Sequence, residues 1–260
     1  MGVRADGSVL VVIDLERRGG IAILTMRHGK ANAFDLELCD ALTARFEEVR
    51  RSPVDAVVIT GQANVFSAGV DLLRVLDGGA AYVRQFLPAL SRAFMAVFDC
   101  PTPVVAAVNG HAIAGGCILA CAADVRVMAA GNGRIGVPEL VVGVPFPAAA
   151  FEIVRSIGVR RTGALVLEGR LLSPNEAEQD GLVDRLADAD ALLDAAIRDA
   201  ESLAARPRDA FAMTKRQLRA PAMERIERGR SSIDPEVIDS WCADSTLARI
   251  RTYVERTLKK

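Results

Sequence analysis

Short runs of apolar, mostly β-branched residues alternate with glycine-rich turns and amphipathic helical patterns along the first two thirds of the chain. Runs typical of strands occupy residues 9–16, 21–26, 56–60, 103–108 and 125–128. The pair Gly19-Gly20 joins the first two runs and predicts a hairpin. Apolar residues at helical spacing predict helices over 35–51, 82–98 and 115–122. Asp35 is the predicted N-cap of the first helix.

From about residue 188 onward the pattern becomes helical and more charged. Separate helices are predicted there over 209–218, 223–230 and 245–258. Pro207, Pro221 and Pro235 punctuate these segments, and a proline inside a helix removes a backbone hydrogen bond. Repeated strand, loop and helix followed by such a region predicts an α/β fold with a helical C-terminal appendage.

Composition narrows the class of protein. Of the 260 residues, 51% are hydrophobic and 25% are charged, and the net charge is −1. This nearly neutral charge provides no attraction to nucleic acid or to an anionic membrane. No apolar run reaches the roughly 18 residues that a membrane span needs, and the N-terminus lacks a signal-peptide pattern. A cytoplasmic location is expected.

The cysteines and histidines do not form a metal-binding pattern. Five cysteines are scattered along the chain, and their odd number argues against a disulfide framework. Cys117 and Cys121 share a predicted helical face, but there is no CxxC pair, and His28 and His111 are the only imidazoles. We therefore expect no metal site, and interpret these two cysteines as small core residues.

Two glycine-rich loops, residues 61–72 and 109–117, each follow a strand-like run and lead toward a helical pattern. Small residues such as Ala68 and Gly115 leave the backbone open to a ligand. Main-chain N–H groups in such loops can converge on one oxygen that becomes negative, as a thioester carbonyl does when its α-carbon loses a proton. The alternative is that the loops are only tight turns with close packing.

Glu139 is the candidate acid or base. It is the only charged residue between Arg134 and Glu152, and apolar surroundings raise the pKa of a carboxyl group so that it can accept and return a proton. The alternative is an exposed helix start after Pro138, where the helix dipole favours a carboxylate. Lys30 and the pair 215–216 have the charge to meet phosphates, but a solvated surface is the better interpretation for each.

These residues resemble the crotonase, or enoyl-CoA hydratase/isomerase, superfamily. The resemblance extends from about Val11 to the C-terminus and is carried by residues 66–72, 103–124 and 135–139. It implies a spiral of ββα units over residues 1–198, followed over 199–260 by a helical region that builds trimers or dimers of trimers. It also implies an acyl-CoA thioester substrate, with CoA as part of the substrate and no separate cofactor.

The resemblance also assigns site residues. The catalytic set comprises Glu139 and the N–H groups of Ala68 and Gly115. The implied substrate contacts are Ala68, Gly69, Val70, Asp71, Leu72, Gly115 and Pro138, with Ala31 and Ala33 toward the adenine end of CoA.

Ile118 is a departure from the hydratases of the family, which carry a glutamate three residues after the oxyanion glycine as well as one at position 139. Hydration needs a water to be oriented and deprotonated, a task that two carboxylates divide. One carboxylate in a dry pocket instead fits a Δ3,Δ2-enoyl-CoA isomerase of fatty acid β-oxidation. Residues 65–72, 114–119, 145–146 and 253–256 resemble the mitochondrial-type isomerases. The alternatives are a hydratase or other lyase, and a non-catalytic acyl-CoA-binding protein.

Overall fold

Two sheets form the framework of the protein. The computed structural model describes residues 12–158 and 162–257 of the chain. The larger sheet has the order β1-β2-β3-β5-β7-β10, and its strands are Ile13–Arg18, Ile21–Met26, Ala56–Thr60, Val104–Val108, Val125–Ala129 and Arg185–Ala187. The smaller sheet has the order β4-β6-β8-β9, with strands Val65–Ser67, His111–Ile113, Ile135–Gly136 and Leu171–Leu172.

The middle of the chain repeats one unit. Strand β3 of the large sheet is followed by β4 of the small sheet and helix α2 (Leu72–Phe98). Strands β5 and β6 then precede α3 (Gly115–Ala122), and β7 and β8 precede α4 (Glu139–Val142). Because equivalent strands pair in parallel, each unit is stacked on the one before it. The predicted α/β fold with a spiral of ββα units is confirmed.

The hairpin and the first helix follow the sequence pattern. Strands β1 and β2 pair antiparallel from Ile13 opposite Met26 to Arg18 opposite Ile21. Residues 9–11 of the predicted first strand lie outside the described residues. Helix α1 (Leu36–Arg51) begins after Asp35, whose side chain accepts a hydrogen bond from the Leu38 N–H at 2.9 Å.

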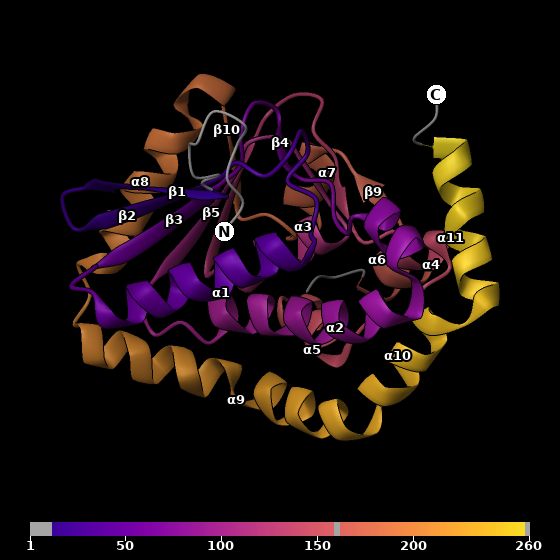
Figure 1. Ribbon diagram of the computed structural model, residues 1–260. Helices are drawn as coiled ribbons and strands as arrows, with labels where there is room; N and C mark the ends of the chain where they lie inside the picture. The colour runs from indigo at the N-terminus through magenta and orange to yellow at the C-terminus, as the bar shows by residue number, and fades with distance from the viewer. Residues whose placement is uncertain (1–11, 159–161, 258–260) are drawn as a thin grey trace, which may run out of the picture.

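Both faces of the large sheet are covered. In strand β3, Val57 and Ile59 face the main core, whereas Ala56 and Val58 face a second cluster beneath helix α8 (Leu192–Ala204). Figure 1 shows α8 on one side of the sheet and α1 and α2 on the other. Strands buried on both sides carry continuous apolar runs, which explains why β3 and β5 were readable from the sequence.

Helix α2 is longer than the predicted helix over 82–98. It starts at Leu72, and Gly79 interrupts it with φ +55° and ψ −151°. Glycine adopts this left-handed conformation without the clash that a Cβ would cause. The kink separates a short first segment, next to the first glycine-rich loop, from the long apolar segment that the periodicity revealed. The remaining short helices are α5 (Ala148–Ser156), α6 (Thr162–Leu167), α7 (Pro174–Gln179) and the 3₁₀ turn η1 (Ala189–Ala191).

The C-terminal region is helical, as expected, but two predicted helices are one. Helix α9 (Arg208–Ser232) continues through Pro221, so the predicted break is wrong. Ala222 and Ile226 of α9 are buried in the core, and this packing outweighs the roughly 3 kcal/mol that an internal proline costs. Helices α10 (Asp234–Cys242) and α11 (Asp244–Thr257) follow. The proposed boundary at residue 198 falls inside α8, and the oligomerisation role of the last helices stays a prediction.

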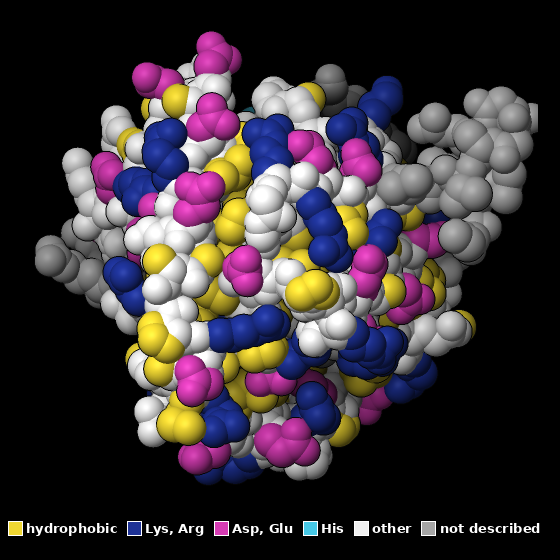
Figure 2. All heavy atoms as spheres, turned by 90° about the vertical axis from the view of Figure 1, so that its left-hand side faces the viewer, with side chains coloured by type: hydrophobic (Ala, Val, Ile, Leu, Met, Phe, Trp, Pro, Cys, Tyr) yellow, Lys and Arg dark blue, Asp and Glu magenta, His cyan; other side chains and the backbone are white. Residues whose placement is uncertain are grey.

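The distribution of charge on the surface agrees with the nearly neutral net charge. On the face shown in Figure 2, Lys and Arg side chains are interspersed with Asp and Glu rather than gathered into a patch of one sign. Among the described residues, none of the helices combines the length and the apolar character needed to cross a bilayer.

Candidate active site

The sequence-predicted residues meet at one cavity of about 70 Å³. Its lining includes Ala68, Val70, Leu72, Gly115, Pro138 and Glu139. Ala68 and Val70 come from the loop between β4 and α2, and Leu72 starts α2. Gly115 starts α3, and the last two residues lie at the start of α4. Because the ββα repeat brings successive loops to the same edge, residues far apart in the chain converge here.

Glu139 is buried in this cavity, with 8% of its surface exposed. Its Oε2 atom has no hydrogen-bond partner among the described residues. Burial raises the pKa of Glu139 from 4.5 to about 8, partly opposed by a hydrogen bond from its own backbone N–H. The alternative of an exposed helix start is therefore wrong: Glu139 does start a helix, but its carboxyl group points into the protein.

The two glycine-rich loops are in direct contact. Gly69 has φ +87°, and a Cβ at that position would lie 2.8 Å from both the Cβ of Ala114 and the carbonyl oxygen of Ile113. Ala114 itself has φ +51°, an uncommon value for alanine, immediately before α3. The close approach holds both loops at one side of the cavity, so their glycines do more than form separate turns.

The backbone N–H groups of the first loop differ in availability. Ala68 donates its N–H to the carbonyl oxygen of Ala31 at 2.9 Å. Phe34 pairs in parallel with Val70 through its N–H to the Gly69 carbonyl and its carbonyl to the Asp71 N–H. In this pairing the Val70 N–H points away from Phe34, and within residues 12–158 and 162–257 it has no hydrogen-bond acceptor.

This pattern corrects the sequence-based assignment of Ala68 as an N–H donor to the substrate. The Ala68 N–H is already engaged, whereas Val70, two residues later, lines the cavity and has an N–H without an acceptor among the described residues. Gly115 keeps its predicted availability, since the first N–H groups of a helix have no intrahelical partner and no acceptor for it lies in the described part of the chain. Ala68 still lines the cavity.

Asn32 and Ser67 support these loops, and sequence reasoning missed both. Asn32 is fully buried with φ +47°, and its side chain donates to the carbonyl oxygen of Phe66 at 3.1 Å. Ser67 Oγ donates to the Asn32 carbonyl at 2.7 Å and accepts from the Gly69 N–H at 3.2 Å. No sequence pattern marked either residue, because the burial that makes a polar side chain need partners is a property of the fold.

The remaining predicted contacts surround the cavity rather than line it. Gly69 packs between the loops, and Asp71 caps α2 by accepting from the Arg74 N–H at 3.0 Å. Ala31 and Ala33 are half-buried in the segment before α1. The assignment of these two alanines to the adenine end of CoA stays a prediction.

Two residues of the C-terminal helices complete the lining. Trp241 of α10 and Tyr253 of α11 border the same cavity as Glu139 and Gly115. Figure 1 shows α11 beside α4, and α10 and α11 both pack against α2. Ile118 of α3 also lines the cavity, with 3% of its surface exposed. Glu139 and the Tyr253 hydroxyl are the only ionisable side chains on the described lining.

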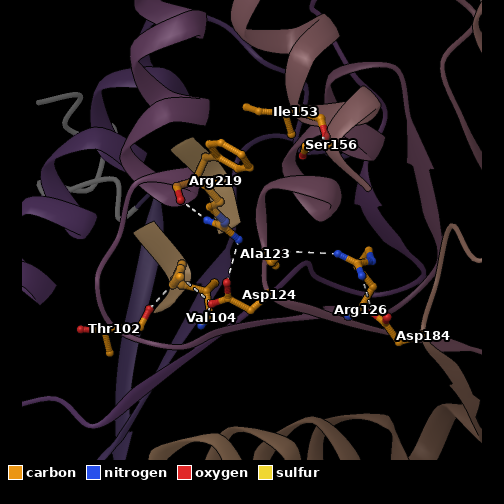
Figure 3. A network of polar contacts seen from close by, with 11 residues as sticks. Thr102, Val104, Ala123, Asp124, Arg126, Ile153, Ser156, Asp184 and Arg219 are labelled. Carbon is orange, nitrogen blue, oxygen red and sulfur yellow. Dashed lines mark hydrogen bonds and ion pairs between the residues drawn. The ribbon is translucent and has the colours of Figure 1, made fainter. Parts of the chain in front are cut away.

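A buried ionic cluster fixes the opposite end of α3. Asp124 accepts hydrogen bonds from the Val104 N–H at 2.8 Å, Lys215 Nζ at 2.6 Å and an Arg219 nitrogen at 2.7 Å. Figure 3 shows Arg219 directed at Asp124, with Arg126 beyond it bonded to the Ala123 carbonyl and to Asp184. Lys215 is 7% exposed, so its interpretation as solvated surface is wrong.

Among the described residues, no group of three His, Cys, Asp or Glu side chains is arranged to hold a metal ion.

Comparison with known proteins identifies the family. The family model described as enoyl-CoA hydratase/isomerase matches residues 16–257. The chain belongs to the enoyl-CoA hydratase/isomerase family. A putative enoyl-CoA hydratase of Thermus thermophilus is 35% identical over 208 residues, covering 78% of this chain and 82% of the relative.

Isomerases are among the relatives of this enoyl-CoA hydratase/isomerase family member. The mitochondrial enoyl-CoA delta isomerase 1 of Mus musculus is 26% identical over 263 residues, covering 100% of this chain and 91% of the relative. The structure of human mitochondrial delta3-delta2-enoyl-CoA isomerase shares the fold, with a TM-score of 0.91, 24% identity and coverage of 96% and 99% of the two chains. The chain is therefore an enzyme of a family acting on acyl-CoA substrates, whose named members include both hydratases and isomerases.

Proposed function

We propose that the protein is a Δ3,Δ2-enoyl-CoA isomerase acting in fatty acid β-oxidation. The observation that carries the proposal is the lone carboxyl group of Glu139 in an apolar cavity, with Ile118 at the position where the hydratases of the family carry a second glutamate. A double-bond shift needs one group that removes a proton and returns it, with no net uptake of water. One buried carboxylate is sufficient for that chemistry.

In the proposed reaction the Glu139 carboxylate removes a proton from C2 of a 3-enoyl thioester. The electron pair of that C–H bond extends over C2 to C4 and the thioester carbonyl as a dienolate. The N–H groups of Val70 and Gly115 hydrogen-bond the developing oxyanion, and the helix start at Gly115 adds a partial positive charge. Glu139 then returns the proton to C4, leaving the conjugated 2-enoyl thioester and the ionised carboxylate.

The electrostatics of the site support this cycle. A carboxyl group with a pKa of about 8 is a stronger base than an ordinary glutamate and still ionises near neutral pH. Its Oε2 atom has no hydrogen-bond partner in the part of the chain that the structure describes, so it is available to a substrate C–H group. Apolar neighbours such as Ile118 and Val142 offer no hydrogen bond that would hold a competing water near the dienolate.

A hydratase is the second candidate, and two observations favour it. The first is the name of the Thermus thermophilus relative, a putative enoyl-CoA hydratase. The second is Tyr253, which lines the cavity and carries a hydroxyl group that offers a point of attachment for a water. In that case Glu139 would deprotonate the water that Tyr253 holds.

One pair of substrates separates the candidates. The enzyme is mixed with a 3-enoyl-CoA or a 2-enoyl-CoA of the same length, and the products are resolved by chromatography. Isomerase activity converts the first to the conjugated thioester and leaves the second unhydrated. Fast formation of 3-hydroxyacyl-CoA from the 2-enoyl substrate would reject the isomerase in favour of the hydratase. Tight binding of acyl-CoA without turnover of either substrate would identify a non-catalytic binding protein.

A further inference from the structure

The cavity around Glu139 is small. Its volume of about 70 Å³ has room for about five groups the size of a water molecule, at roughly 10–15 Å³ for each. Because the thioester end of a substrate must reach Val70 and Gly115, this space receives the acyl carbons that follow the carbonyl. An acyl chain of about six carbons fills it.

Trp241 forms a rigid part of the wall. It is 3% exposed, and its indole Nε1–H donates to the carbonyl oxygen of Pro145 at 2.9 Å. Pro145 also lines the cavity, so the hydrogen bond holds the indole ring against another part of the same wall. A buried aromatic ring with its polar atom satisfied has few alternative orientations, and the wall cannot yield by rotation of this side chain.

A second, larger hollow lies behind that wall. Its volume is about 390 Å³, and it is lined mainly by apolar residues of α2 and α10, including Leu87 and Val237. Val237 precedes Trp241 by one helical turn, and Leu87 precedes the cavity-lining Leu90 by three residues, so each pair shares a helix face. Pro147 borders both spaces. Trp241 lines the cavity but not the hollow, so the hollow is space for a longer chain that lies beyond the residues on the Trp241 side of the cavity.

We propose that Trp241 is the specificity-determining residue that limits the enzyme to short-chain acyl-CoA thioesters. The inference rests on the proposed function, because it assumes that the acyl group occupies the cavity beside Glu139. Medium and long chains are excluded by the indole ring, and removal of the ring joins the cavity to the hollow behind it. A substrate that is one methylene too long for an apolar pocket loses about tenfold or more in kcat/KM.

The first test measures kcat/KM for 3-enoyl-CoA substrates of six, eight, ten and twelve carbons. The parent enzyme is expected to prefer six carbons to ten by at least about tenfold. Trp241→Leu is expected to raise the ten-to-six ratio at least about tenfold, with Trp241→Phe intermediate. The ratio is independent of the fraction of folded enzyme, so partial destabilisation leaves it unchanged. Equal use of six and ten carbons by the parent, or an unchanged ratio in Trp241→Leu, would overturn the proposal.

A second pair of variants narrows the cavity instead of opening it. Ala150 lines the cavity, whereas its neighbour Ala149 is equally buried, with both 2% exposed, and does not line it. Ala150→Val is expected to lower kcat/KM for six carbons at least about tenfold relative to four. Ala149→Val adds the same methyl groups to the same helix and is expected to leave that ratio unchanged. The same effect in both variants would contradict a length limit set by this wall.

Binding separates this inference from the proposed function. Calorimetry with butanoyl-, hexanoyl- and decanoyl-CoA measures chain-length preference without any reaction. If no 3-enoyl substrate is converted, the isomerase proposal fails, and weaker binding of decanoyl-CoA that Trp241→Leu reverses still supports the length limit. If isomerisation is found but decanoyl-CoA binds the parent as tightly as hexanoyl-CoA, the length limit fails and the proposed function stands.

Discussion

Ala68 donates its backbone N–H to the carbonyl oxygen of Ala31, 2.9 Å away, and so ties the first glycine-rich loop to the segment before α1. This bond leaves the N–H of Val70, rather than that of Ala68, available at the cavity. The position of the Val70 N–H relative to Gly115 then depends on the close contact between Gly69 and Ala114. The geometry of the donor pair is therefore set by packing between loops, which is open to mutation.

A methyl group at position 69 tests this packing. Gly69→Ala places a Cβ 2.8 Å from the Ala114 Cβ in a left-handed conformation, so we expect a loss of about 2 kcal/mol or more in unfolding free energy. Displacement of the donors should lower kcat about 100-fold. Chemical denaturation and steady-state kinetics measure both. Gly19→Ala is the control, because Gly19 has φ +58° with no atom within 4 Å of the added Cβ. Gly19→Ala should lose about 1 kcal/mol of unfolding free energy and keep its kcat. Equal losses of kcat in the two variants would contradict the inference that packing between the two loops positions the donors.

The role of Glu139 as the base is tested by Glu139→Gln. The amide keeps the shape of the side chain but cannot accept the C2 proton, so we expect kcat to fall at least about 100-fold with the fold intact. Circular dichroism and turnover of a 3-enoyl-CoA are the measurements. Glu152→Gln is the matched control: Glu152 is buried to a similar extent, 7% against 8% exposed, but pairs with Arg155 and Arg225. It should lose stability and retain kcat. A loss of turnover in the control alone would reject the assignment.

The raised pKa of Glu139 predicts two pH dependences. The base is ionised only above its pKa, so kcat/KM should fall about tenfold per pH unit below about 8. The free energy of unfolding should change with pH in the opposite direction to kcat/KM. The unfolded chain releases this proton near pH 4.5 and the folded chain near 8, so the unfolding free energy should fall as pH rises between these values and level off above 8. Glu139→Gln should lack this component in a series of denaturation curves. Parallel curves for the two proteins would show that burial does not raise this pKa.

Ile118 determines whether the cavity can hold a catalytic water. Ile118→Glu adds a second carboxyl group to the cavity wall, and we expect hydration of a 2-enoyl-CoA to rise at least about tenfold above the parent. Formation of 3-hydroxyacyl-CoA, with incorporation of labelled oxygen from water, measures the gain. Ile118→Leu keeps the wall apolar and should show no gain. Fast hydration by the parent itself would remove the basis of this prediction.

The ion pair between Lys215 and Asp124 joins α9 to the far end of α3 from the cavity. Lys215→Met leaves Asp124 with one cation fewer in a buried setting, so we expect the unfolding free energy to fall by about 3 kcal/mol. Urea denaturation measures the loss, and kcat of the folded protein should change little because Lys215 does not line the cavity. The exposed neighbour Arg216, changed to Met, should stay within about 0.5 kcal/mol of the parent. Equal stability of the two variants would show that the pair contributes nothing.

Much of the framework was predictable because local patterns encode backbone conformation. The buried runs of β3 and β5 and the helical face of α1 were identified from apolar spacing alone. Glu139 stood out because a single charge within a long apolar stretch is uncommon in a sequence. Pro221 shows the limit of such reasoning: its residue type predicts a break, but burial of Ala222 and Ile226 maintains α9.

The site itself required contacts between distant segments. Trp241 and Tyr253 lie about a hundred residues beyond Glu139 in the sequence, and no local pattern assigns them to the same cavity. Lys215 looked like a surface cation because its partner, Asp124, lies 91 residues away. Side chains so separated are brought together by helix packing, which periodicity does not encode.

The amino-acid sequence by itself determined strands β1, β2, β3, β5 and β7 of the large sheet, the glycine-rich loops, the lone glutamate and the resemblance to the family, since each depends on residue type and short spacing. Only the tertiary structure decided that the Ala68 N–H is bonded while that of Val70 has no acceptor among the described residues, that the Glu139 carboxyl is buried, and that Trp241 lines the same cavity. These outcomes depend on which segments meet in space, where a shift of one hydrogen bond changes the group that a substrate encounters.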